Sequence, residues 1–251
     1  MGYIESSSEK GVQILKLNRG VTNPLNLELV EELAACLKEV KENDTLTSLV
    51  IGSGNEKFFS LGFDIPELST KGPKEFETFF RAYNLLCLDL YTLPKPTIAA
   101  LTGHTVAGGF ILASCCDFRL LSQGKKFCAL NEINLGVPVP FLADYILRQL
   151  VGDRRATEVM YFGNMIPAEE ALKMGIVDNL FPVDQVWPEA IAKAQALGAL
   201  PISAFGAIKA NRTRDVAALI QQRLEEDIQL FIKFWFMDEA RKRLQEAMKK
   251  F

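Results

Sequence analysis

The order of strand-like and helical segments near the start of the chain constrains the fold more than any other feature. Residues 12–18 (Val-Gln-Ile-Leu-Lys-Leu-Asn) are typical of a strand, and residues 49–51 (Leu-Val-Ile) form a second apolar run that ends in glycine and serine. Between them, Asn26 can cap a helix whose apolar residues recur at helical spacing up to Val40. Because two strands joined by a helix pack as a right-handed crossover unit, the sequence predicts an α/β fold with a parallel sheet.

The rest of the chain continues this alternation and then becomes helical. Further strands are predicted at residues 97–101 and 118–121, and helices at residues 76–90 and 110–116. From Trp187 onward the strand signals stop, helical spacing of apolar residues takes over, and one long helix is predicted over residues 217–250. We therefore predict a core domain over residues 1–195 and a helical C-terminal region over residues 196–251.

Composition and charge exclude several classes of protein. With 251 residues, 49% of them hydrophobic and 24% charged, the chain is ordinary for a globular protein. A net charge of −3 gives no electrostatic attraction for nucleic acid or an anionic membrane, and no apolar run reaches the roughly 18 residues that span a bilayer. The five cysteines form no Cys-x-x-Cys pair, and one histidine cannot complete a Cys/His cluster, so we expect no metal site.

Three segments carry candidate chemistry. Residues 57–65 (Lys-Phe-Phe-Ser-Leu-Gly-Phe-Asp-Ile) follow a predicted strand, and residues 103–109 (Gly-His-Thr-Val-Ala-Gly-Gly) lead into a predicted buried helix. N–H groups at a helix start have no intrahelical partner and favour negative charge, although a glycine pair is more often a packing device. In residues 130–138, Glu132 lies between apolar residues. It is either an exposed loop carboxylate or a buried one whose raised pKa suits proton transfer.

The order and spacing of these three segments resemble those of the crotonase (enoyl-CoA hydratase/isomerase) superfamily. Residues 93–100, 116–119 and 168–178 also match, so the resemblance covers nearly the whole chain. It implies a crotonase-like spiral of ββα units with a helical C-terminal trimerisation region. It also implies an acyl-CoA substrate without a separate cofactor, because coenzyme A is part of the substrate, and a homotrimer or a dimer of trimers.

The resemblance also assigns roles to individual residues. Backbone N–H groups of Phe63 and Gly108 would form an oxyanion hole for the thioester carbonyl, and Glu132 would be the acid/base. His104 is given a structural role, and one or two of the aromatic residues in the segment 231–236 are expected to close over the acyl path. The residues expected to bind substrate or CoA are Leu61, Gly62, Asp64, Ile65, Lys209 and, with a weaker case, Lys57; those expected to line the acyl pocket are Phe80, Tyr83, Phe141 and Leu142.

The number of carboxylates separates the reactions within the superfamily. Hydration of a 2-enoyl-CoA typically uses two carboxylates, and Ile111 occupies the position of the first. A single base, Glu132, suits a double-bond shift in which the C2 proton is removed and returned at C4. Residues 127–132 (Phe-Cys-Ala-Leu-Asn-Glu), one residue longer than the usual hydratase stretch, and residues 137–141 (Val-Pro-Val-Pro-Phe) after them resemble the mitochondrial-type Δ3,Δ2-enoyl-CoA isomerases. Pro140 replaces the second acid of the 2,4-dienoyl-CoA isomerases, but Asp144, one helical turn further on, could supply another.

Two alternatives to this isomerase remain open. One is a different crotonase-fold acyl-CoA enzyme, such as a hydratase or a decarboxylase, and the other is a non-catalytic acyl-CoA-binding protein. An exposed Glu132 far from Gly108 would favour the binding protein. The predicted setting is fatty-acid β-oxidation, in the cytoplasm or in an organellar matrix after processing.

Overall fold

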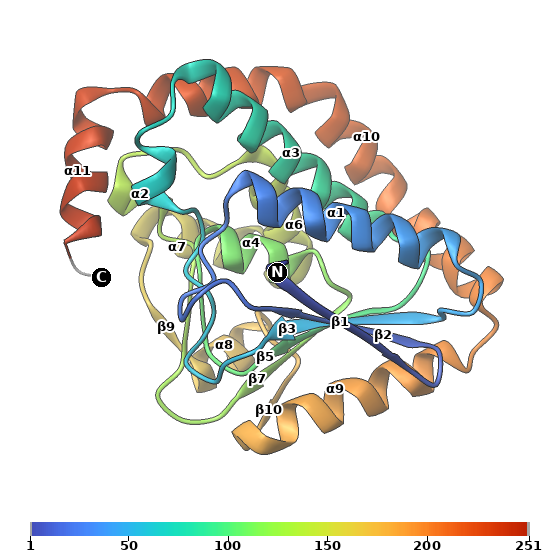
Figure 1. Cartoon of the computed structure of the whole chain (residues 1–251). Coiled ribbons are helices and arrows are strands. Elements are labelled where there is room, and N and C mark those ends of the chain that lie inside the picture. Colours follow the sequence, from blue (N-terminus) through green and yellow to red (C-terminus); the bar gives the residue numbers. More distant parts are fainter. Residues whose placement is uncertain (1, 250–251) are drawn as a thin grey trace.

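The computed structural model describes residues 2–249 and contains a six-stranded sheet at its centre (Figure 1). The edge strand nearest the N-terminus of the chain pairs antiparallel with its neighbour, and all the other pairs in this sheet are parallel. In spatial order the strands are β1 (Ile4–Glu9), β2 (Val12–Leu17), β3 (Ser48–Ser53), β5 (Thr97–Leu101), β7 (Phe118–Ser122) and β10 (Asn179–Phe181). The parallel sheet predicted from the sequence is confirmed. Strand β1 was not predicted, because its Ile-Glu-Ser-Ser-Ser-Glu sequence is polar, as suits an exposed edge strand.

A second, smaller sheet is built from four short strands, of which the first three each follow a strand of the first sheet. Its order is β4 (Phe58–Ser60), β6 (His104–Val106), β8 (Phe127–Ala129) and β9 (Ile166–Pro167), of which the first three are parallel. The chain therefore repeats one pattern three times: a long strand, a short strand and then a helix. This repeat is the predicted spiral of ββα units. Its short strands end at one edge, where the segments that follow them lie close together.

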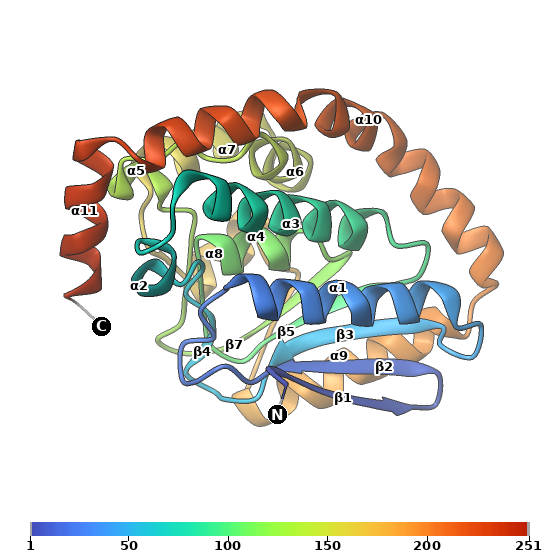
Figure 2. The same ribbon diagram turned by 45° about the horizontal axis from the view of Figure 1, so that its top comes forward.

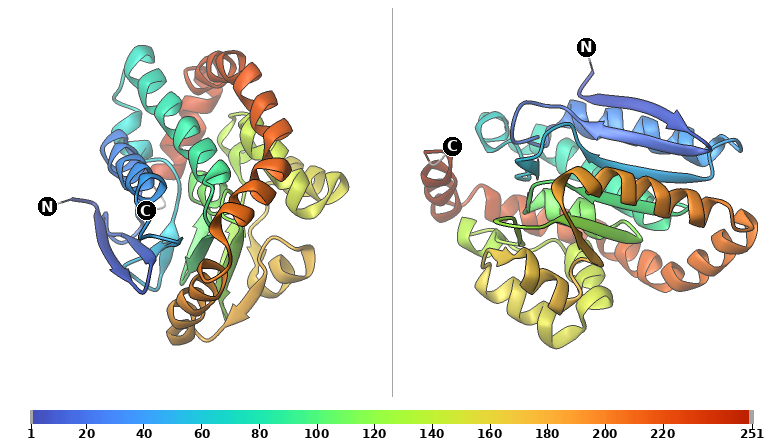
Figure 3. Two further views of the ribbon diagram at one scale, coloured as in Figure 1. Left: turned by 90° about the vertical axis from the view of Figure 1, so that its right-hand side faces the viewer. Right: turned by 90° about the horizontal axis from the view of Figure 1, so that it is seen from below.

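Helices cover both faces of the six-stranded sheet (Figures 2 and 3). One face is covered by α1 and α3, and the other by α9, which contacts five of the six strands. The helices are α1 (Leu27–Glu42), α2 (Ile65–Leu68), α3 (Pro73–Thr92), α4 (Gly108–Ser114), α5 (Glu132–Leu135), α6 (Phe141–Val151), α7 (Asp153–Phe162), α8 (Ala168–Met174), α9 (Val183–Gly198), α10 (Ile202–Trp235) and α11 (Asp238–Met248).

Helix α1 shows why the local predictions succeed. The side chain of Asn26 accepts a hydrogen bond from the backbone N–H of Leu29 at 3.1 Å, which is the capping contact expected from the sequence. The apolar residues at helical spacing are all buried, and they begin with Leu29 and end with Val40. The 3.6-residue period thus fixed both the helix and the face that it buries.

The C-terminal region is helical, as predicted, but it is divided differently. Helix α10 runs for 34 residues across α3 and α6, and α11 turns back beside the ββα core (Figure 2). The break falls at Phe236 and Met237, whereas the sequence predicted one continuous helix from residue 217 to 250. In the described part of the chain, no single helix is long and apolar enough to cross a membrane; only α9 and α10 taken together, bent by 102°, pass that test.

Candidate active site

Glu132 lies in a small, almost entirely apolar cavity at the edge where the short strands end. It is the first residue of α5, three residues after β8, and only 5% of its surface is exposed. The cavity encloses about 30 Å³. Segments from distant parts of the chain line it: Leu61, Phe63, Ile65, Ala107, Gly108, Ile111, Glu132, Leu135, Val137, Pro140, Phe231 and Trp235.

The surroundings of Glu132 bring the pKa of its carboxyl group close to neutral pH. Burial raises the pKa of Glu132 to about 7, because the ionised form loses its hydration, and the hydrogen bond from its own backbone N–H offsets only part of that loss. Within residues 2–249, Oε2 of Glu132 has no hydrogen-bond partner, and no lysine or arginine lines the cavity. A carboxyl group that titrates near neutral pH can both accept and return a proton.

Two backbone N–H groups lie beside this carboxyl group. Gly108 begins α4, so its N–H has no carbonyl four residues earlier within the helix. Next to the cavity, Leu25 donates to the Gly62 carbonyl at 2.8 Å and accepts from Asp64 at 2.9 Å. These two hydrogen bonds form a parallel β-bridge between Leu25 and Phe63. They involve the residues on either side of Phe63, and the Phe63 N–H takes no part in them. Across residues 2–249, neither the Gly108 nor the Phe63 N–H has a protein acceptor.

Glycine is required where the two segments meet. A Cβ atom on Gly62 would lie 2.8 Å from the Gly108 nitrogen, and the φ angle of Gly62 is +89°, which favours glycine. A Cβ atom on Gly108 would lie 2.9 Å from the ring of Phe63. Between them, Ala107 has a φ angle of 49°, a strained conformation for a non-glycine residue. The close approach therefore brings two N–H groups without acceptors to one cavity wall, which is the arrangement of an oxyanion hole.

Of the predicted substrate-binding stretch, Leu61, Phe63 and Ile65 line the cavity, and Gly62 lies between them at the contact with Gly108. Asp64 does not line it. Its carboxylate caps α2 by accepting from the Glu67 N–H at 2.9 Å and pairs with Arg19 at 2.6 Å. Asp64 thus holds the turn that carries its neighbours.

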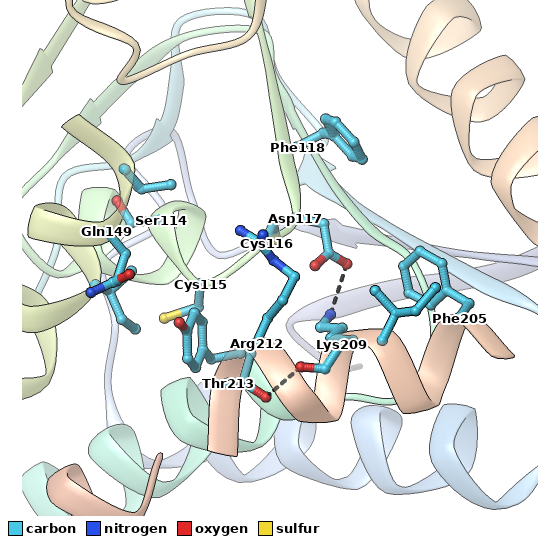
Figure 4. A pocket seen from close by; sticks show the side chains of 14 residues that line it. Ser114, Cys115, Cys116, Asp117, Phe118, Gln149, Phe205, Lys209, Arg212 and Thr213 are labelled. Atoms are coloured by element: carbon cyan, nitrogen blue, oxygen red, sulfur yellow. Dashed lines mark hydrogen bonds and ion pairs between the residues drawn. The ribbon is translucent and has the colours of Figure 1, made fainter. Parts of the chain in front are cut away.

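The structure does not bring either predicted CoA lysine to the cavity. Lys209 lies in α10 beside a separate cavity of about 340 Å³, where its Nζ is 2.7 Å from Oδ2 of Asp117 (Figure 4). Its side chain is only 5% exposed, so a buried ion pair occupies the ammonium group that the sequence had assigned to a phosphate. Lys57 is exposed, with Nζ 5.3 Å above the ring of Phe58.

The four residues predicted to line the acyl pocket do not line this cavity. Phe80 and Tyr83 are buried one layer behind it, because the ring of Phe63 stands in between, with ring centroids 6.1 Å and 4.9 Å away. Phe141 and Leu142 follow Pro140, which does line the cavity, but they lie in α6, where Phe141 packs against Arg223 and Tyr145. The role of these four residues in binding an acyl chain stays a prediction.

Helix α10 supplies two walls that lie about 100 residues from Glu132 in sequence. Phe231 and Trp235 are one helical turn apart, 2% exposed each, and both line the cavity. Trp235 also stacks on Phe76 of α3, with ring centroids 4.4 Å apart. Two aromatic residues of the segment 231–236 thus line the cavity, and their closing over the acyl path stays a prediction. Leu135 and Val137 were missed, because nothing in their spacing shows which way a loop faces.

Asp144 and His104 lie outside the cavity, and Ile111 lines it with an apolar side chain. Asp144 forms a two-point ion pair with Arg148, through hydrogen bonds of 2.7 Å each, and does not line the cavity. His104 accepts the Phe127 N–H at Nδ1 and stacks on the Phe127 ring, so it has the structural role predicted for it. Ile111 lines the cavity. Glu132 is therefore the only carboxylate on the cavity wall in the described part of the chain.

The described residues contain no group of three or more His, Cys, Asp or Glu side chains that could hold a metal ion. The site can therefore be specified from the chain's own groups: one carboxyl group that titrates near neutrality, two backbone N–H groups and apolar walls.

Comparison with known sequences and structures agrees with this geometry. A family model described as enoyl-CoA hydratase/isomerase matches residues 7–251. The chain belongs to that family. Human mitochondrial enoyl-CoA delta isomerase 1 is 30% identical over 243 residues, which cover 96% of this chain and 80% of the human protein. A probable enoyl-CoA hydratase of Mycobacterium tuberculosis is 32% identical over 206 residues, which cover 82% of this chain and 78% of the relative.

Solved structures of the family share the whole fold. The crystal structure of human mitochondrial delta3-delta2-enoyl-CoA isomerase superposes with a TM-score of 0.95 at 28% identity, covering 99% of this chain and 97% of that one. A Bacillus halodurans enoyl-CoA hydratase superposes with a TM-score of 0.90 at 22% identity, which shows the fold alone. Isomerases and hydratases of the enoyl-CoA hydratase/isomerase family are thus both similar to this chain, and the choice between the two reactions depends on the site.

Proposed function

We propose that this protein is a Δ3,Δ2-enoyl-CoA isomerase, which converts 3-enoyl-CoA thioesters to trans-2-enoyl-CoA. One observation carries the proposal: Glu132 is the only carboxylate on an apolar cavity whose wall also contains Phe63 and Gly108. Proton removal and return need one such group, whereas the addition of water needs a second polar group to hold and activate the water. The similarity to human enoyl-CoA delta isomerase 1 supports the same choice.

The reaction begins when the thioester carbonyl oxygen accepts hydrogen bonds from the Phe63 and Gly108 N–H groups. The carboxylate of Glu132 then removes a proton from C2, and the electron pair of the broken C–H bond delocalises into a dienolate whose negative charge rests mainly on that oxygen. Protonated Glu132 returns the proton at C4, and the double bond moves from C3–C4 to C2–C3. A pKa near 7 lets the same group act as base and then as acid.

The apolar wall protects the intermediate from water. Ile111, Val137 and Pro140 offer no group that could hold a water molecule against C3 of the conjugated product. With no polar side chain to bind water beside the dienolate, the proton is returned by Glu132.

The proposal extends to the biological setting. It takes an acyl-CoA substrate with no separate cofactor, fatty-acid β-oxidation as the pathway, and a homotrimer or a dimer of trimers as the assembly. The human and mouse enoyl-CoA delta isomerases 1 are mitochondrial proteins, which supports an organellar matrix as the compartment, with the cytoplasm as the alternative.

The test offers purified protein a trans-3-enoyl-CoA of medium chain length and follows the conjugated product by its ultraviolet absorbance. The same preparation is offered the 2-enoyl-CoA and assayed for hydration. Glu132→Gln removes the proton-accepting form of the side chain and keeps its size. Asp144→Asn is the matched control, because it neutralises a nearby carboxylate that lies outside the cavity.

Conjugation that is lost in Glu132→Gln and kept in Asp144→Asn, with negligible hydration, is the expected result. Efficient hydration by the wild-type protein would instead make it a hydratase with an unrecognised second acid. Tight thioester binding with neither reaction would identify a decarboxylase or a non-catalytic acyl-CoA-binding protein, according to whether a carboxylated acyl-CoA is turned over.

A further inference from the structure

The helix that carries half of the oxyanion hole has little means of fixing its own start. Helix α4 is only seven residues long, and its first two residues, Gly108 and Gly109, are the most flexible type. The residue before it, Ala107, has a strained φ angle of 49° and offers no side-chain capping hydrogen bond. Within the helix, the hydrogen bond from the Ile111 N–H to the Ala107 carbonyl, at 3.0 Å, restrains the peptide unit that carries the Gly108 N–H; further restraint comes from groups outside the helix.

Tyr83 reaches this point from α3. Its hydroxyl group donates a hydrogen bond of 2.6 Å to the carbonyl oxygen of Gly108. Its ring packs edge-on against the ring of Phe63, with centroids 4.9 Å apart and planes inclined by 84°. Tyr83 thus contacts both residues whose N–H groups form the hole, through one polar and one apolar contact, and it does not itself line the cavity.

The three residues also contact one another. The ring of Phe63 lies 2.9 Å from the place where a Cβ atom of Gly108 would be, so it rests directly on the glycine. Tyr83 is 1% exposed and encloses this contact from the side of the core. Burial raises the pKa of Tyr83 well above its ordinary value, so the phenol keeps its proton and remains a donor across the working pH range.

We propose that Tyr83 is a positioning residue that holds the Gly108 and Phe63 N–H groups in the orientation that binds the thioester oxygen. The proposal rests on the oxyanion hole of the proposed function. Fixing the Gly108 carbonyl restricts rotation about the backbone bonds of that glycine, and the Phe63 ring prevents its main chain from drifting. Preorganised donors stabilise developing charge because they need no reorientation during the reaction.

A core tyrosine that only satisfies its own hydroxyl group would behave differently. Its loss would lower stability and leave the turnover of the folded enzyme unchanged. A positioning residue affects the step in which charge reaches the oxygen, so its loss lowers kcat more than it changes KM. The polarisation of the bound carbonyl reports the same difference without any turnover.

The test compares Tyr83→Phe with Tyr91→Phe. The first keeps the ring and its packing and removes only the hydroxyl group. The second removes a hydroxyl group from the same helix, at a residue that lines the cavity beside Lys209. We measure kcat and KM for 3-enoyl-CoA, the thermal midpoint, and the infrared frequency of the thioester carbonyl in a bound saturated acyl-CoA.

For Tyr83→Phe we expect a fall in kcat of roughly tenfold, smaller than the loss caused by removing a hole donor outright, with KM within about twofold. The carbonyl band, which binding to the wild-type protein shifts to lower frequency, moves back toward its value in water. Tyr91→Phe leaves both quantities at wild-type values.

Wild-type kcat and carbonyl frequency in Tyr83→Phe would overturn the proposal, and so would a fall in kcat without a change in the carbonyl band. The infrared readout separates this proposal from the proposed function. The wild-type protein could fail to isomerise 3-enoyl-CoA and still shift the carbonyl band, with the shift reversed in Tyr83→Phe. That outcome would contradict the proposed reaction and support the role of Tyr83.

Discussion

The carboxyl groups near the two ends of helix α4 differ in whether a cation pairs with them. At its N-terminus, Gly108 and Ile111 line the cavity that holds Glu132, which has no charged partner there. Just past its C-terminus, Asp117 forms a buried ion pair with Lys209 beside the larger cavity (Figure 4). A carboxyl group left alone in an apolar wall has a shifted pKa and can do chemistry, whereas a paired one fastens segments together.

The carboxylate of Asp117 joins three segments of the chain. Oδ2 of Asp117 accepts hydrogen bonds from the N–H and the hydroxyl group of Thr97, at 2.8 and 2.9 Å, as well as from Lys209. These contacts join the strand β5, the start of β7 and the helix α10. Helix α10 thus carries the cation of this ion pair near its start and two residues of the other cavity wall, Phe231 and Trp235, near its end.

The largest effect is expected when Glu132, the carboxyl group without a cation, is replaced. Glu132→Gln should lower kcat for 3-enoyl-CoA by about 10³-fold or more, because no other proton acceptor lines the cavity. The KM should change little, since the thioester oxygen is bound by backbone groups. Steady-state kinetics with the conjugated product as readout checks this, and a residual rate above about a tenth of wild type would mean that a different base acts.

Removing the paired charge should produce the reverse pattern. Lys209→Met should lower the free energy of unfolding by about 2–3 kcal/mol, because it leaves a partly buried Asp117 without its cation, and kcat should stay near the wild-type value. Urea denaturation measures the loss, and Lys57→Met, at an exposed lysine, should stay within about 0.5 kcal/mol. An unchanged stability together with a raised KM for the thioester would return Lys209 to its predicted role at the CoA phosphates.

The pH dependence tests whether Glu132 titrates where its burial places it. The carboxylate is the reactive base, so kcat/KM should fall as the pH drops below about 7, by close to tenfold for each further pH unit. Circular dichroism over the same range controls for unfolding. An acidic limb near pH 4 to 5, the ordinary range of a glutamate, would show that the cavity is wet in solution.

The same carboxylate should cost stability above neutral pH. The unfolded chain ionises Glu132 near pH 4.3, and the folded chain only near pH 7, so this residue stabilises the fold below about pH 4 and that contribution is lost as pH rises through 7. Between pH 5 and 8, Glu132→Gln should therefore gain about 2 kcal/mol relative to the wild-type protein. Urea denaturation at both pH values checks the difference, and a constant gap between the two proteins would contradict the raised pKa.

The smallest effect is expected at Asp144. Asp144→Asn breaks a surface ion pair with Arg148, worth less than about 1 kcal/mol, and should alter isomerisation and hydration by less than about twofold. Parallel assays of both reactions measure this. A larger fall in hydration than in isomerisation would show that Asp144 reaches the cavity during turnover.

Local sequence patterns predicted the parts of this molecule that depend on near neighbours. The Asn26 cap, the buried face of α1 and the strand at 97–101 were correct because capping, helical period and apolar runs are properties of a few consecutive residues. The break of the C-terminal helix at Phe236 was not, because it does not follow from local spacing.

The candidate site divides in the same way. The sequence by itself determined the family and the residue types that the chemistry needs: a glutamate among apolar residues and glycines before a helix. Only the tertiary structure decided which of them meet. Among the described residues, it buried Glu132 in a wall without lysine or arginine, set Tyr83 behind the ring of Phe63, and paired Lys209 with Asp117. The physical reason is that desolvation and ion pairing are set by neighbours distant in sequence, which no local pattern encodes.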